Sequence, residues 1–183
     1  MPEKSASLAA GERLGAGEAT AAGEVHITRV FDAPRALVFQ AWSDAERLAQ
    51  WHAPRGCTIT FSRFDFRPGG TFISTLRTPE NYECRCRGVY QEITAPERIR
   101  YTLGFSDEEG NLVEPSARGM DPDWPRETTV TVTFAEHNGK TTLTLHQTVS
   151  EPLARETGAY PSWLEMFDRL AEGMAEAGIP PSR

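Results

Sequence analysis

The chain has 183 residues, of which 39% are hydrophobic and 25% charged, and its formal net charge is −7 at pH 7. This length and composition are typical of one globular domain and argue against a wholly disordered chain. The acidic balance excludes binding that depends on a basic surface, so neither nucleic acid nor an anionic membrane is expected as a partner. No run of about 18 apolar residues is present, so no membrane insertion is expected.

The beginning of the chain predicts a boundary and a location. Residues 1–23 are rich in Ala and Gly and carry few large apolar side chains, so a disordered tail is predicted there, followed by a single domain over 24–179. The tail has no apolar stretch of signal-peptide length. The three cysteines, Cys57, Cys84 and Cys86, form no disulfide framework. A cytoplasmic protein is therefore expected.

The first part of the predicted domain contains one strand and two short helices. Residues 24–31 (EVHITRVF) favour a strand. Asp32 precedes a helix whose apolar residues recur at helical spacing up to Trp42. Asp44 precedes a second short helix that ends near Trp51.

Six further strands are predicted, because apolar and polar side chains alternate and turn residues separate the runs. These strands are 57–66, 71–77, 82–93, 98–105, 128–134 and 141–149. Six consecutive strands after the helical segment imply one antiparallel meander. The segment 106–127 is long for a hairpin connection, and two interpretations stay open: a lid over a cavity, or a solvated excursion.

A long amphipathic helix is predicted at the end of the domain. Ser162 and Glu165 have the spacing of a capping box, which predicts that the helix begins at Ser162. Trp163, Phe167 and Leu170 lie on one stripe and are expected to face the sheet. The fold class is therefore α+β, with a curved antiparallel sheet of about seven strands wrapped on this helix and two short helices after the first strand.

Few residues suggest catalysis or metal binding. Cys84 and Cys86 face the same side of a strand, but structural zinc sites use a wider spacing and a second pair, so we interpret both as small buried side chains. No nucleophile elbow or phosphate-binding loop is present. His146 is expected on the solvated face of its strand. We assign no catalytic residue, metal or cofactor, and do not favour an enzyme.

Aromatic side chains give the strongest functional signal, because they are spread over many elements that meet in the interior. In a sheet curved around one helix they either fill the core or line a space that a ligand can enter. Both interpretations stay open. The candidate ligand-binding residues, as the lining of such a space, are Phe61, Phe72, Tyr90, Tyr101, Phe105, Trp124, Trp163, Phe167 and Leu170.

A family resemblance covers residues 24–175. It is carried by the segments RVFDAPRALVFQAWSDAERLAQW (29–51), DFRPGGTF (65–72), GVYQEITAPERIRYTL (88–103), TVTVTFAEHNGKTTLTL (129–145) and WLEMFDRLAE (163–172). In these segments the chain resembles the activator of heat-shock-protein-90 ATPase homologues, mostly small bacterial proteins of the START-related, polyketide-cyclase-like superfamily. The resemblance implies the helix-grip fold. It departs at His52-Ala53-Pro54, where the family often has an aromatic residue and Gly-Pro, so no role is carried over to this loop.

Three classes of function stay open. The first, which we favour, is binding of a small apolar or amphipathic molecule in a cavity between the sheet and the last helix. The second is a cyclase-like or dehydratase-like enzyme, which would need at least two titratable side chains converging in that cavity. The third is a chaperone-ATPase-activator-like interaction with a chaperone partner. The eukaryotic activators also use a separate N-terminal domain, which residues 1–23 are too short to supply. A homodimer is compatible with all three.

Overall fold

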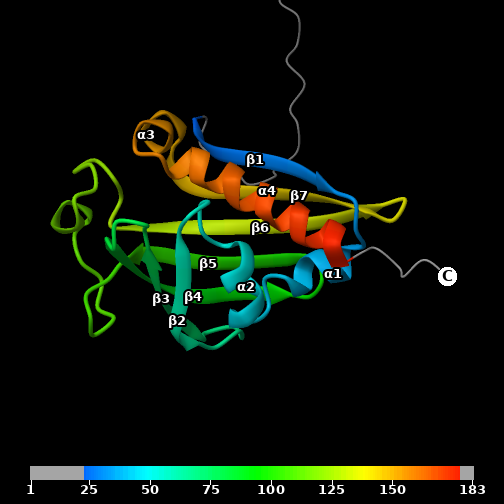
Figure 1. Ribbon diagram of the computed structural model, residues 1–183, viewed down its shortest axis with the longest axis horizontal. Coiled ribbons are helices and arrows are strands. Elements are labelled where there is room, and N and C mark those ends of the chain that lie inside the picture. The colour runs from blue at the N-terminus through cyan, green and yellow to red at the C-terminus, as the bar shows by residue number, and fades with distance from the viewer. Residues whose placement is uncertain (1–22, 178–183) are drawn as a thin grey trace, which may run out of the picture.

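The computed structural model describes residues 23–177, and these form a seven-stranded antiparallel sheet with the helices α1, α2 and α4 on one face (Figure 1). The predicted tail 1–23 lies outside the described residues except for Gly23. The last two residues of the predicted domain, 178 and 179, also lie outside them.

The elements follow the predicted order with two additions. They are β1 (Glu24–Phe31), α1 (Arg35–Gln40), α2 (Ala45–Trp51), β2 (Thr58–Phe64), β3 (Thr71–Arg77), β4 (Glu83–Thr94), β5 (Arg98–Phe105), η1 (Pro115–Arg118), β6 (Glu127–His137), β7 (Lys140–Ser150), α3 (Glu151–Glu156) and α4 (Ala159–Ala177). The strand order is β1-β7-β6-β5-β4-β3-β2, so β2 to β7 form the meander and β1 pairs with β7. The predicted α+β, helix-grip class is confirmed.

One addition is the 3-10 helix η1, which lies within the segment 106–127. The other is the short helix α3, which follows β7 directly. Its first turn contains Pro152, and the Ser150 hydroxyl accepts a hydrogen bond from the Leu153 amide at 3.5 Å. A helix of six residues is too short for an apolar periodicity to show. Only its capping serine and early proline could have indicated it.

The long helix α4 begins three residues before the predicted start. Gly158 has φ of +85°, a left-handed conformation that glycine adopts without strain, and it turns the chain directly before α4. The predicted capping box at Ser162 is wrong. Ser162 lies inside the helix, where its amide donates to the Gly158 carbonyl oxygen at 3.1 Å, and the Glu165 carboxylate accepts from the Arg55 amide instead.

Alternate residues of the strands form the core on the face that α4 covers (Figure 1). Val130 and Val132 of β6 and Leu143 and Leu145 of β7 have no exposed surface. The predicted orientation of the helix stripe is confirmed, because Trp163, Phe167 and Leu170 are all buried. The sheet–helix interface therefore contains most of the hydrophobic core.

Candidate functional site

A cavity of about 240 Å³ lies between the N-terminal half of α4 and the part of the sheet formed by β2 to β5. Met120 and Trp124, from the segment between β5 and β6, complete its wall. An apolar cavity of about 150 Å³ is large enough to hold benzene. The interior of this protein therefore has room for a small organic molecule.

Seven of the nine predicted ligand-binding residues line this cavity. They are Phe61, Phe72, Tyr90, Tyr101, Phe105, Trp124 and Trp163. Ligand binding by them stays a prediction.

Phe167 and Leu170 are not part of the cavity lining, and their assignment to it is corrected. Phe167 lies one helical turn beyond Trp163, where its ring meets the edge of the Phe31 ring at a centroid distance of 6.3 Å. Phe167 is fully enclosed and Leu170 retains 2% of its surface, so both belong to the solid core. The stripe on α4 is continuous, but the cavity ends before its second half.

Phe72 occupies its place because β4 has a glycine beneath it. A Cβ atom on Gly88 would lie 2.3 Å from Phe72 Cζ and 2.1 Å from the Thr102 carbonyl oxygen. The Phe72 ring can therefore lie close to the sheet, and its centroid is 5.5 Å from Tyr90 and 5.7 Å from Tyr101. These three rings form a continuous aromatic part of the wall.

Sequence reasoning missed several lining residues, among them Trp42, His52 and Gln147. Gln147 could have been found, because it continues the inward alternation of Leu143 and Leu145 on β7. Trp42 was expected only as part of a helix face. His52 lies in a loop, where no periodicity predicts the direction of a side chain.

The wall carries little charge. Among the described residues, no Asp, Glu, Lys or Arg lines the cavity. Burial lowers the pKa of His52 to about 4, so its imidazole is neutral near pH 7. Burial also raises the pKa of the Tyr90 and Tyr101 phenols far above the usual value. An ion that entered this space would lose its hydration and would find no countercharge in the cavity wall. A neutral molecule does not carry this cost.

Cys84 and Cys86 lie side by side on the inner face of β4, as predicted, and both line the cavity. They are half-buried rather than enclosed. The hydrogen bond between the two thiols, followed by the charge of Arg118, lowers the pKa of Cys84. The same hydrogen bond, together with burial, raises the pKa of Cys86. The two thiols are therefore chemically different.

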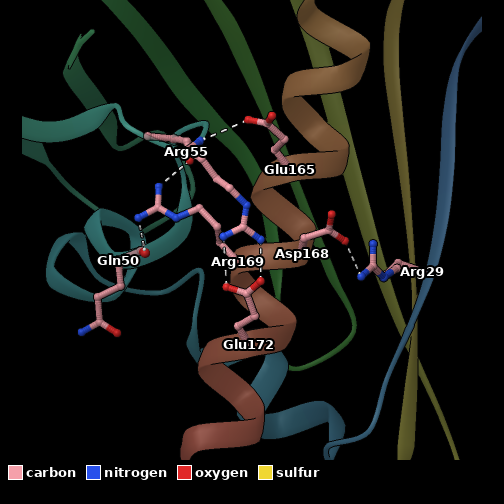
Figure 2. A network of polar contacts seen from close by, with 8 residues as sticks. Arg29, Gln50, Arg55, Glu165, Asp168, Arg169 and Glu172 are labelled. Atoms are coloured by element: carbon pink, nitrogen blue, oxygen red, sulfur yellow. Dashed lines mark hydrogen bonds and ion pairs between the residues drawn. The ribbon is translucent and has the colours of Figure 1, made fainter. Parts of the chain in front are cut away.

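Arginine side chains tie the loop 52–57, which supplies His52 to the cavity, to the outer side of α4 (Figure 2). The guanidinium of Arg169 donates to the carbonyl oxygens of Ala53 at 2.5 Å and Gln50 at 2.9 Å. Arg55 pairs with Glu172 at 2.5 Å. On the other side of the helix, Asp168 forms an ion pair with Arg29 of β1 at 2.6 Å (Figure 2). These contacts fix α4 to the end of α2 and the loop 52–57 on one side and to β1 on the other.

Two further features concern residues 23–177 only. Within this range, no three His, Cys, Asp or Glu side chains gather closely enough to hold a metal ion. No helix of this range is long and apolar enough to cross a bilayer.

His146, which was expected to be exposed, is half-buried on the outer face of the sheet. Its ring stacks on that of His26 with a centroid distance of 4.7 Å, and its Nε2 lies 2.5 Å from a carboxylate oxygen of Glu24.

Comparison with known proteins gives one family and a set of similar folds. The family described as Activator of Hsp90 ATPase homolog 1-like protein matches residues 32–175. A solved structure from Arthrobacter aurescens is 23% identical with a TM-score of 0.72, covering 88% of this chain and 89% of that one. A solved structure from Chromobacterium violaceum is 24% identical with a TM-score of 0.67, and the match covers 82% of this chain and 95% of that one.

The AHSA1 protein of Silicibacter pomeroyi is 18% identical, with a TM-score of 0.66 over 84% of this chain and 99% of that one. At these identities the likeness of the structures shows the fold alone. No curated protein matches this chain in sequence.

Proposed function

The chain belongs to the family of Activator of Hsp90 ATPase homolog 1-like proteins, and within this family we propose that it binds a small apolar or amphipathic molecule in the cavity between the sheet and α4. The observation that carries the proposal is the cavity itself, with its volume of about 240 Å³ and its lining of aromatic and aliphatic side chains. A molecule of matching size would make dispersion contacts with these side chains and remove their apolar surface from water.

The segment between β5 and β6 supports the lid interpretation over that of a solvated excursion. Trp124 is 9% exposed, and both it and Met120 line the cavity. The segment is also held to the sheet, because the Val113 amide donates to the Phe105 carbonyl oxygen at 3.0 Å. It therefore supplies one wall of the proposed binding site.

A neutral fluorescent probe tests the proposal directly. N-phenyl-1-naphthylamine should bind the folded protein near one-to-one and quench tryptophan emission, and Trp163→Phe should remove much of this quenching. Ser74 is 6% exposed and lines the cavity, so Ser74→Leu should reduce its volume and weaken probe binding. Ser62 is exposed on β2, and Ser62→Leu is the matched control that should leave probe affinity unchanged.

Two outcomes would contradict ligand binding: probe uptake only on unfolding, or equal affinity in the Ser74→Leu and Ser62→Leu proteins. The protein would then have to act through its surface, and the chaperone-partner alternative would be favoured. Native mass spectrometry of protein purified from its own host complements the titration, because a retained molecule would appear as added mass. Turnover of that molecule would instead favour the cyclase-like or dehydratase-like alternative.

A further inference from the structure

Cys84 and Cys86 form a thiol pair in the cavity wall that the proposed ligand binding does not use. They occupy alternate positions of β4, so both side chains project from the same face of the strand. Both are half-buried and both line the cavity. A molecule that enters the cavity therefore reaches a pair of sulfur atoms.

The surroundings make Cys84 the more reactive of the two. Its thiolate is stabilised by the hydrogen bond with Cys86 and by the nearby charge of Arg118, which together hold its pKa below the usual value. Geometry places Arg118 beside this part of β4, because its guanidinium donates to the Ser106 carbonyl oxygen at 2.8 Å, and the Ser106 amide donates at 2.9 Å to the carbonyl oxygen of Arg85, the residue between the two cysteines. A partly exposed cysteine beside a cation is the environment in which protein thiols become nucleophiles.

The neighbours of the pair decide what kind of molecule can approach through the cavity. Leu76 lies opposite Cys84 on β3, and Phe105 lies opposite Cys86 on β5; both also line the cavity. Because no Asp, Glu, Lys or Arg is among the described lining residues, a charged reagent would lose hydration without direct contact with a countercharge. The approach from this side favours uncharged, apolar compounds.

We propose that Cys84 captures uncharged, apolar α,β-unsaturated carbonyl compounds that enter the cavity, an inference that rests on the proposed ligand binding. The Cys84 thiolate attacks the β-carbon, so that a carbon–sulfur bond forms while the π bond between the α- and β-carbons breaks. The electron pair moves to the carbonyl oxygen as an enolate. The proton released when Cys84 ionised returns through water to the α-carbon. The product is a saturated carbonyl adduct on Cys84, and no oxidant or reductant is consumed.

The test uses 3-nonen-2-one with the folded full-length chain near neutral pH, followed by intact-mass measurement and peptide mapping. One adduct is expected, on Cys84. An excess of 2-nonanone, which has the same size but cannot undergo the addition, should slow the reaction by occupying the cavity. Cys57→Ser should react like the unaltered protein, Cys84→Ser should lose the adduct, and Cys86→Ala should react about three- to tenfold more slowly because one hydrogen bond to the thiolate is lost.

Labelling of Cys57 or Cys86 before Cys84, or an unchanged rate in excess 2-nonanone, overturns the inference. Peptide mapping of the unaltered protein gives this answer even where a variant does not fold. Displacement of N-phenyl-1-naphthylamine by 2-nonanone is measured in parallel. If the ketone displaces the probe and Cys84 stays unmodified, covalent capture is wrong and ligand binding stands. If the probe does not bind the folded protein, ligand binding itself is wrong.

Discussion

The indole nitrogen of Trp163 on α4 donates a hydrogen bond to the side-chain oxygen of Gln147 on β7 at 2.9 Å, inside the protein. The other end of the same amide donates to the Thr128 hydroxyl at 3.0 Å. Gln147 is 3% exposed, so one buried amide joins the helix to two strands. This contact fixes the position of Trp163 at the edge of the cavity.

Gln147→Met should lower the free energy of unfolding by about 1–3 kcal/mol, because it leaves the Trp163 indole nitrogen without its acceptor. Urea denaturation measures the loss. Gln40→Met, at an exposed position at the end of α1, is the control and should change the value by less than about 0.5 kcal/mol. Equal effects of the two substitutions would contradict this role of the amide.

Removal of the Tyr101 hydroxyl should stabilise the protein, whereas the substitution of Gln147 should destabilise it. Its hydroxyl is buried without a hydrogen-bond partner among the described residues, so Tyr101→Phe should raise the free energy of unfolding by about 1–3 kcal/mol. The Tyr82 hydroxyl donates to the Arg118 carbonyl oxygen at 2.8 Å, so Tyr82→Phe should lower the value by up to about 1 kcal/mol. A clear loss of stability in Tyr101→Phe would show that its hydroxyl is in fact paired, for instance with a bound water molecule.

Arg169 caps the end of α2 from another helix. It binds the Gln50 and Ala53 carbonyl oxygens, which the helical hydrogen-bond pattern leaves free. Arg169→Met should lower the free energy of unfolding by about 1–3 kcal/mol and speed amide exchange in residues 52–57. Asp168→Asn removes only a solvent-exposed ion pair with Arg29 and should cost less than about 1 kcal/mol. Unchanged exchange in Arg169→Met would count against the cap.

His52 should make stability depend on pH. Its pKa is about 4 in the folded protein because of burial, against an ordinary value near 6.5. Between these two values the unfolded chain binds a proton that the folded chain does not, so stability is lost as the pH falls from about 6.5 to about 4. Because His52 is half-buried, water reduces the loss, which is at most about 3 kcal/mol. His52→Phe should remove this part of the pH dependence of stability. His137→Gln, at the exposed end of β6, should leave it unchanged.

Phe167→Ala should cost about 3–5 kcal/mol, since the ring is fully enclosed by Phe31, Trp42, Trp51 and Trp163. Leu164, 38% exposed on the same helix, provides the control, and Leu164→Ala should cost less than about 1 kcal/mol. Thermal or urea unfolding measures both. A cost below about 1 kcal/mol for Phe167→Ala would mean that the ring lies in an already loose space.

The strands and their inner faces could be predicted from the sequence because alternation is a local property of the chain. Tyr101 on β5 and Val130 on β6 both lie inside as expected. The extent of the cavity could not be predicted in this way. Trp163 and Phe167 share one stripe of α4, and only the packing of α2 and β1 decides that the first borders a space and the second does not. The predicted start of α4 was wrong for a related reason. The turn at Gly158 and the contact of Glu165 with Arg55 outweigh the local capping signal of Ser162 and Glu165.

The walls of the cavity come from residues as far apart as Trp42 and Met166, and α4 follows every other described element along the chain. A ribosome therefore delivers the aromatic strands β3 to β5 well before the helix that covers them. Until α4 has left the exit tunnel, Phe72, Tyr90 and Tyr101 face water or whatever holds the nascent chain. The apolar surface that later lines the cavity is thus prone to aggregation during synthesis, and α4 covers it once this helix has emerged.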